Sequence, residues 1–220
     1  MYGIVKDNLL QIRKEIEPCQ PRIIAVTKYY NANAIINAYE AGLRDFGESR
    51  ALEACEKINS LPLEVRENSH FHFIGHLQTN KVKNVVGAFD YIHSVDSLKL
   101  AQLISQTAIS QKIVQKILVQ VNNACEEQKF GFSKEDCFKA FEEILQYEGV
   151  KVVGLMNMAP LGASNAMLHS LFGEIRHLRD SIETKYSCKL PELSMGMSQD
   201  YSIAAIEGAT MLRIGRKLFT

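Results

Sequence analysis

The feature that most constrains the fold is a unit repeated along the whole chain: a short apolar run, a polar or glycine-containing turn, and a stretch with helical spacing. We count eight such units in the 220 residues. Runs such as Ile23-Ile24-Ala25-Val26 and Ile117-Leu118-Val119 are apolar along their whole length, which is typical of parallel strands covered on both faces. The expected strands are residues 22–27, 43–46, 70–74, 91–94, 116–121, 151–156, 192–194 and 210–214.

Helical spacing separates these runs. The expected helices are residues 33–41, 49–58, 97–109, 134–147, 166–185 and 200–206, with an additional helix over 4–16 before the first strand. Asp96 and Ser133 stand where an N-cap oxygen would accept the free amides of a first turn. Eight βα units predict an α/β protein, with residues 1–220 forming one (β/α)8 barrel domain. An open doubly wound sheet is the competing architecture.

The charge balance and the apolar pattern exclude several classes of partner. Lys and Arg number 25 and Asp and Glu also 25, so the chain lacks the positive field by which nucleic-acid binders neutralise phosphates. Its apolar runs are too short to span a bilayer, and the N-terminus has no charged segment followed by an apolar one and a cleavage site. We therefore expect a cytoplasmic protein that binds neither nucleic acid nor membranes.

Cysteines and histidines give no indication of a metal centre. The cysteines at 19, 55, 125, 137 and 188 are odd in number, widely spaced and without a C-x-x-C pair, so we expect reduced, structural thiols. His70, His72 and His76 are the nearest approach to a ligand pattern, but no thiol or carboxylate lies close in sequence to complete a shell.

Lys28 follows the first expected strand directly. Ligands bind at the carboxyl ends of the strands in this kind of barrel, so residues in this position are candidates for chemistry. A lysine at the mouth of a barrel loses hydration of its ammonium, which favours a free amine able to attack an aldehyde. The alternative is a lysine that only extends to solvent at a strand end.

Two glycine-containing turns, after the seventh and eighth strands, favour a phosphate site. Gly196 lets backbone amides approach a ligand closely, and the free amides at a helix start attract anions. Arg213 and Gly215 add a second turn beside positive charge, in the loops where barrels of this fold often hold phosphate. For the first turn, a plain N-cap at Ser198 with no ligand is the alternative.

Other strand ends carry neutral hydrogen-bonding groups. Gln78, Asn80 and Asn157 are suited to orienting a ligand, whereas Met156 and Met158 are more typical of core filling. Neither a nucleophile elbow nor a G-x-x-x-x-G-K-[ST] phosphate loop is present.

Taken together and in order, these segments resemble a known family. They are Ala25-Val26-Thr27-Lys28, Phe46-Gly47-Glu48-Ser49, residues 74–81, residues 155–160, Ser194-Met195-Gly196-Met197-Ser198-Gln199-Asp200 and Arg213-Ile214-Gly215. The family that they resemble is the pyridoxal phosphate (PLP) homeostasis family, over the chain from about residue 4 to the C-terminus. The resemblance implies a barrel related to the N-terminal domain of alanine racemase, PLP fold type III.

The resemblance also implies roles for single residues. Lys28 matches the lysine that forms the internal aldimine with PLP, and Arg213 matches the arginine that faces the pyridine nitrogen. Ser194 and Gly196, together with Gly215, match the phosphate cradle. The remaining expected cofactor contacts are Ser49, Met156, Asn157 and Met195. Ser49 stands where many members have Asn, and Arg216 stands where a small hydroxyl residue is common.

The function that the resemblance implies is a PLP-binding protein of intracellular vitamin B6 homeostasis. It would hold PLP as the Lys28 aldimine and supply it to apo PLP-dependent enzymes, without catalytic activity of its own. A PLP-dependent amino-acid racemase is the first alternative, but racemisation needs a second acid/base that related racemases bring from an extra domain, and the eight units leave no residues for one. A Schiff-base aldolase acting on a sugar phosphate is the second alternative. We expect a monomer.

Overall fold

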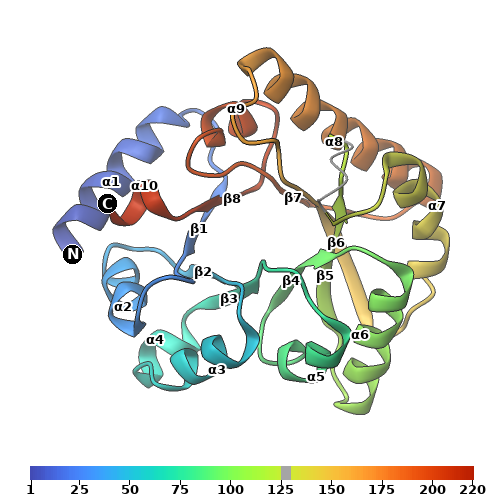
Figure 1. Ribbon diagram of the computed structural model, residues 1–220, viewed down its shortest axis with the longest axis horizontal. Helices are drawn as coiled ribbons and strands as arrows, with labels where there is room; N and C mark the ends of the chain where they lie inside the picture. Colours follow the sequence, from blue (N-terminus) through green and yellow to red (C-terminus); the bar gives the residue numbers. More distant parts are fainter. Residues whose placement is uncertain (125–129) are drawn as a thin grey trace.

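Eight parallel strands close into a barrel in sequence order, β1 to β8 (Figure 1). The computed structural model describes residues 1–124 and 130–220. The strands are β1 (Arg22–Val26), β2 (Asp45–Glu48), β3 (His70–Phe73), β4 (Tyr91–Val95), β5 (Gln115–Val121), β6 (Val150–Asn157), β7 (Glu192–Ser194) and β8 (Met211–Ile214). The closed barrel confirms the predicted (β/α)8 architecture and excludes the open sheet.

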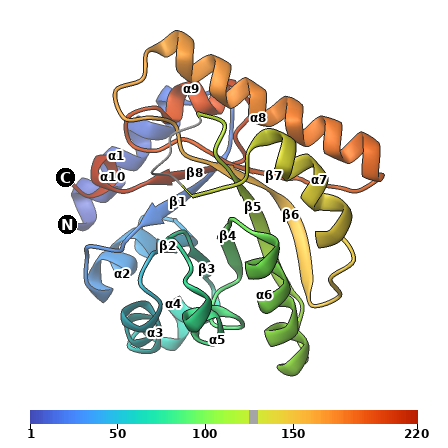
Figure 2. The same ribbon diagram turned by 45° about the vertical axis from the view of Figure 1, so that its right-hand side comes forward.

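Helices form a ring outside the strands (Figure 2). They are α2 (Ala32–Glu40), α3 (Ala51–Asn59), α4 (Leu63–Glu67), the 3-10 helix η1 (Thr79–Lys81), α5 (Val82–Val85), α6 (Leu98–Ser110), α7 (Lys134–Ile144), α8 (Asn165–Tyr186), α9 (Tyr201–Ile206) and α10 (Arg216–Phe219). The additional N-terminal helix is confirmed as α1 (Tyr2–Glu15), which lies beside α10 (Figure 1). Asn8 joins the two chain ends, because its Nδ2 donates to the carbonyls of Leu218 and Thr220, each at 3.2 Å.

Two apolar layers result from the alternation of side chains along the strands. The larger layer fills the space between strands and helices and includes Phe46, Phe73 and Phe141, none more than 2% exposed. The smaller layer is a cluster of Ile24, Tyr91, Leu118, Val153, Met156 and Met211. Full burial of one large apolar side chain contributes about 1.5–3 kcal/mol, so both layers stabilise the barrel.

Local differences from the sequence predictions have local causes. β2 begins two residues later than predicted, because the Leu43 amide bonds to the Ala38 carbonyl at 3.0 Å and so belongs to the end of α2. The N-cap predicted at Asp96 is wrong: Ser97 caps α6, and its hydroxyl accepts from the Leu100 amide at 3.3 Å. The cap predicted at Ser133 is confirmed by a 3.0 Å bond from the Asp136 amide.

Within the described ranges, no helix combines the length and the apolar character that a bilayer span requires. The described cysteines, Cys19, Cys55, Cys137 and Cys188, carry free thiols, and Cys125 lies outside the described residues.

Candidate functional site

Lys28 lies two residues beyond the end of β1, at the carboxyl-terminal face of the barrel. Its side chain is half-buried, and its Nζ lies 5.1 Å from the centre of the Tyr29 ring. This is the face that carries ligand sites in (β/α)8 proteins. The structure thus places a primary amine where the sequence predicts one.

A buried ion pair fixes the backbone next to Lys28. Glu48, which is 2% exposed, accepts hydrogen bonds from Lys57 Nζ at 2.6 Å and from Thr27 Oγ1 at 2.7 Å. Lys57 Nζ also donates to the Thr27 carbonyl at 2.9 Å. The sequence singled out the segment that contains Glu48 but missed Lys57, because Lys57 comes from α3 and only the fold brings it to this strand end.

The loops after β7 and β8 lie against each other. The Arg213 amide donates to the Gly196 carbonyl at 2.9 Å, and the Lys217 amide donates to Ser198 Oγ at 3.4 Å. β8 in turn pairs with β1, and a Cβ built on Gly215 would lie 3.4 Å from Val26 Cβ. The loop after β8 therefore neighbours the strand that leads to Lys28, and the loop after β7 lies one strand farther round the barrel.

Gly196 has a packing requirement in addition to the predicted approach to a ligand. Its φ is +88°, and a Cβ there would lie 2.5 Å from Ala204 Cβ and 3.1 Å from Tyr201 Cα. The glycine thus lets the loop pack closely on α9, and an added side chain would point into the protein rather than toward a ligand. The plain cap at Ser198 is excluded as well, because α9 begins at Tyr201 with Asp200 as its N-cap.

Arg213 lies inside the barrel, 4% exposed. Its Nη1 donates to Ser194 Oγ and its Nη2 to the Asn157 carbonyl, both at 2.7 Å. Burial lowers the pKa of Arg213 to about 10, against an opposing effect of the Asp200 charge. At neutral pH the guanidinium therefore remains protonated, and its two described acceptors are uncharged.

The other predicted contacts divide into polar and apolar positions. Asn157 is fully buried, and its Nδ2 donates to Asn123 Oδ1 at 3.2 Å, whereas its own Oδ1 has no hydrogen-bond partner among residues 1–124 and 130–220. Ser49 is half-buried, with its carbonyl only 2.5 Å from where a Cβ on Gly75 would lie. Met156 belongs to the smaller apolar cluster and Met195 to the larger layer outside the strands. Any contact from Met195 would therefore be made by its backbone.

The histidines considered as a ligand pattern lie in three separate environments. His70 is exposed and lies 3.8 Å from Asp90, whereas His72 is fully buried and bonded to Asp45 and His93. His76 pairs with Asp96 at 3.2 Å and stacks on Phe130, with 3.7 Å between ring centres. The part of the chain that the structure describes contains no cluster of three or more metal-binding side chains.

The family model of the alanine racemase N-terminal domain matches residues 3–220 of this chain. Pyridoxal phosphate homeostasis proteins of Synechocystis sp. and Aquifex aeolicus are 40% identical over 202 residues and 39% identical over 199 residues. The match to the Synechocystis protein covers 92% of both chains. The match to the Aquifex aeolicus protein covers 90% of this chain and 86% of the relative. The chain belongs to the pyridoxal phosphate homeostasis family.

Solved structures of the family have the same fold. PipY of Synechococcus elongatus without PLP superimposes with a TM-score of 0.91 at 36% identity, covering 98% of this chain and 100% of that one. The PipY structure described as having PLP bound gives a TM-score of 0.87 at 35% identity over the same shares. An alanine racemase of Clostridium difficile superimposes with a TM-score of 0.77 at 15% identity. That match covers 99% of this chain but only 55% of the racemase. The homeostasis family thus shares its barrel with larger enzymes.

Proposed function

We propose that this protein binds pyridoxal phosphate at the mouth of the barrel and holds it covalently through Lys28. In this proposal it serves the intracellular homeostasis of the cofactor and supplies it to other proteins. A cytoplasmic location and a monomeric state, both expected from the sequence, belong to the same proposal.

The observation that carries the proposal is the order β7, β8, β1 of three neighbouring strands. Their carboxyl ends present Gly196, Arg213 and Lys28 side by side: a close backbone turn, a protonated guanidinium and a primary amine. An aromatic aldehyde with a phosphate group and a ring nitrogen needs these three kinds of group. Two relatives, 35% and 39% identical, the first described as having PLP bound, support the same conclusion.

The residues present fit the cofactor. When bound, pyridoxal phosphate supplies an aldehyde that condenses reversibly with a primary amine and releases water. Arg213 offers N–H donors from a buried position, and its described acceptors, Ser194 Oγ and the Asn157 carbonyl, are uncharged. The unpartnered Oδ1 of Asn157 is a second buried polar atom at the same strand ends. Backbone amides of the loops after β7 and β8 would hold the phosphate.

We assign no catalytic turnover to this site. A guanidinium can only donate, so Arg213 would leave a pyridine nitrogen unprotonated, which weakens the ring as an electron sink. Racemisation also needs a second acid/base on the other face of the substrate. An open mouth would instead let an incoming amine displace Lys28 and remove the cofactor.

The test of the proposal is to incubate the PLP-loaded protein with D- and L-amino acids and, separately, with an apo PLP-dependent enzyme. We expect transfer of the cofactor to the apo enzyme, with no sustained conversion of amino acids. Steady racemisation that disappears in Lys28→Ala would instead establish a racemase. If the purified protein takes up no PLP, but turns over a sugar phosphate, the aldolase alternative is correct.

A further inference from the structure

Five buried residues form a hydrogen-bond chain across the barrel interior: Asp45, His72, His93, Ser194 and Arg213. Asp45 Oδ1 lies 2.9 Å from His72 Nε2, and His72 Nδ1 lies 2.9 Å from His93 Nε2. His93 Nδ1 lies 2.8 Å from Ser194 Oγ, which accepts from Arg213 Nη1 at 2.7 Å. We call this set the interior chain. It connects the start of β2 to the guanidinium assigned above to the cofactor ring.

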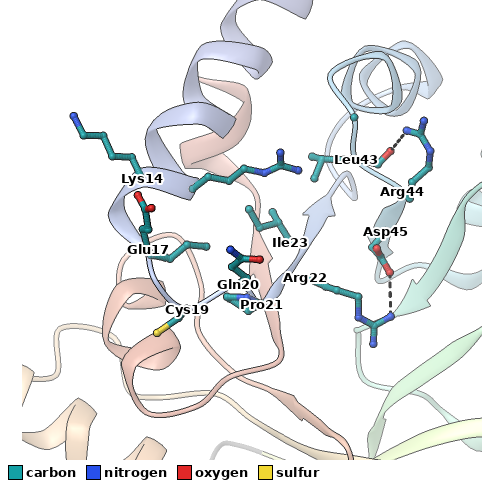
Figure 3. A pocket seen from close by; sticks show the side chains of 13 residues that line it. Lys14, Glu17, Cys19, Gln20, Pro21, Arg22, Ile23, Leu43, Arg44 and Asp45 are labelled. Atoms are coloured by element: carbon teal, nitrogen blue, oxygen red, sulfur yellow. Dashed lines mark hydrogen bonds and ion pairs between the residues drawn. The ribbon is translucent and has the colours of Figure 1, made fainter.

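Asp45, at the end of the interior chain away from Arg213, is a hydrogen-bond acceptor. Burial would raise the pKa of Asp45, but the hydrogen bond from His72 and the charge of Arg22 outweigh it and lower that pKa. Arg22 Nη1 lies 3.5 Å from the carboxylate. Asp45 and Arg22 also line a cavity of about 690 Å³ at the amino-terminal face of the barrel, where Figure 3 shows their side chains meeting. Asp45 is thus ionised and can only accept hydrogen bonds.

The two ends fix the direction of every bond between them. Burial lowers the pKa of His72, and lowers that of His93 well below its usual value, so both rings are neutral. His72 must donate from Nε2 to Asp45, which makes its Nδ1 an acceptor for His93 Nε2–H. His93 Nδ1 is then an acceptor and takes the hydroxyl hydrogen of Ser194. The lone pairs of Ser194 remain for Arg213, which can only donate.

The consequence for Ser194 is specific. Without His93, its hydroxyl hydrogen could rotate toward Arg213 and oppose the guanidinium instead of accepting from it. The Ser194 hydroxyl already makes two hydrogen bonds inside the barrel, one to His93 and one from Arg213. The contribution to a phosphate cradle expected from Ser194 would therefore come from its backbone.

We infer that His93, with His72 behind it, is a positioning residue of the cofactor site. His93 makes Ser194 an acceptor and so sets the orientation in which Arg213 meets the ring nitrogen of the cofactor. His72 sets the tautomer of His93, and Asp45 sets that of His72. This inference rests on the proposed function, and its test must separate the two.

The test compares three variants. His93→Leu keeps the volume of the interior but breaks the chain, whereas His93→Gln retains one donor and one acceptor. Leu118→Ala opens a cavity in the smaller apolar cluster but removes none of the hydrogen bonds of the interior chain, and so controls for loss of stability alone. Each protein is titrated with PLP and with an analogue in which a C–H group replaces the ring nitrogen.

We expect His93→Leu to weaken PLP binding about tenfold, the effect of one lost hydrogen bond to a charged group, and His93→Gln to recover most of that loss. Leu118→Ala should bind PLP like the wild type. For the analogue without a ring nitrogen, wild type and His93→Leu should bind equally, because Arg213 then has nothing to orient toward.

Equal losses for PLP and the analogue in His93→Leu, or a loss in Leu118→Ala as large as that in His93→Leu, would overturn the inference. Both outcomes leave the proposed function intact, provided that borohydride still fixes PLP to Lys28 in the wild type. If the wild type fails to bind PLP, the proposed function fails and the positioning role fails with it.

Discussion

Lys57 donates a hydrogen bond to the Glu48 carboxylate across 2.6 Å and thereby joins α3 to the end of β2. The side chain of Glu48 is 2% exposed and that of Lys57 is 14% exposed, so this pair lies away from water. Through Thr27, which both residues contact, the pair also fixes the backbone that precedes Lys28.

We expect Lys57→Met to lower the free energy of unfolding by about 3 kcal/mol, because it leaves the Glu48 carboxylate buried without its cation. Denaturant unfolding at pH 7 measures the loss. The double variant Lys57→Met, Glu48→Gln is the control, and should recover much of it because no buried charge remains. A single variant as stable as the wild type would mean that the pair does not support this strand end.

A second ion pair predicts a pH dependence. Hydrogen bonds from Tyr201, Gln11 and Lys217 lower the pKa of Glu15 from 4.5 to about 2. A carboxyl whose folded pKa is lowered contributes stability above its unfolded pKa, and that contribution is lost as the pH falls toward the folded value. Glu15→Gln should therefore destabilise the protein at pH 7, by at most about 1 kcal/mol because the groups are partly exposed and solvent screens them.

The difference between Glu15→Gln and wild type should shrink below about pH 4.5 and vanish near pH 2. Thermal unfolding across that range is the measurement, and Glu17→Gln, an exposed carboxylate two residues away, is the matched control. A difference that stays constant with pH would show that the charge of Glu15 is not what stabilises the contact of α1 with α9 and α10.

Gly196 gives a prediction about loop packing. Gly196→Ala places a Cβ at positive φ and 2.5 Å from Ala204 Cβ, so we expect a loss of about 2–4 kcal/mol in stability together with weaker PLP binding. Gly42→Ala is the control, because Gly42 has φ +98° with nothing within 4 Å of an added Cβ. Equal losses at both positions would mean that the backbone conformation alone matters.

Ser198→Ala complements the glycine variant. The Ser198 hydroxyl accepts a 3.4 Å bond from the Lys217 amide, so its removal should change stability by about 0.5 kcal/mol or less. PLP binding should weaken less than in Gly196→Ala, as measured by equilibrium titration. The reverse order of affinities would contradict the placement of the phosphate on backbone amides of this loop.

Local pattern in the sequence was sufficient to predict the eight strands, because most of them contain a short run of apolar or β-branched residues. The bounds predicted for β7, 192–194, are those observed. Helices of four or five residues, such as α5 and α10, were missed because so short a segment shows no period. The start of β2 was predicted two residues too early, because Leu43 is apolar like a strand residue but belongs to the turn after α2.

The candidate site was predictable only where a residue follows its own strand, as Lys28 and Arg213 do. His93 was missed, because a single histidine within an apolar strand is indistinguishable in sequence from a core residue. Its significance comes from partners 21 residues before it and 101 residues after it, which only barrel closure brings together. Lys57 was missed because its partners, Glu48 and Thr27, come near it only in the folded barrel.

The most direct measurement of the central claim is borohydride reduction of the PLP-loaded protein, followed by peptide mapping of the modified lysine. We predict that the label lies on Lys28 alone. Lys28→Ala and Lys28→Arg, the second of which keeps the charge, should take up no label. Their free energies of unfolding should lie within about 0.5 kcal/mol of the wild-type value. A label on any other lysine of the wild type, or an undiminished label in Lys28→Ala, would contradict the account.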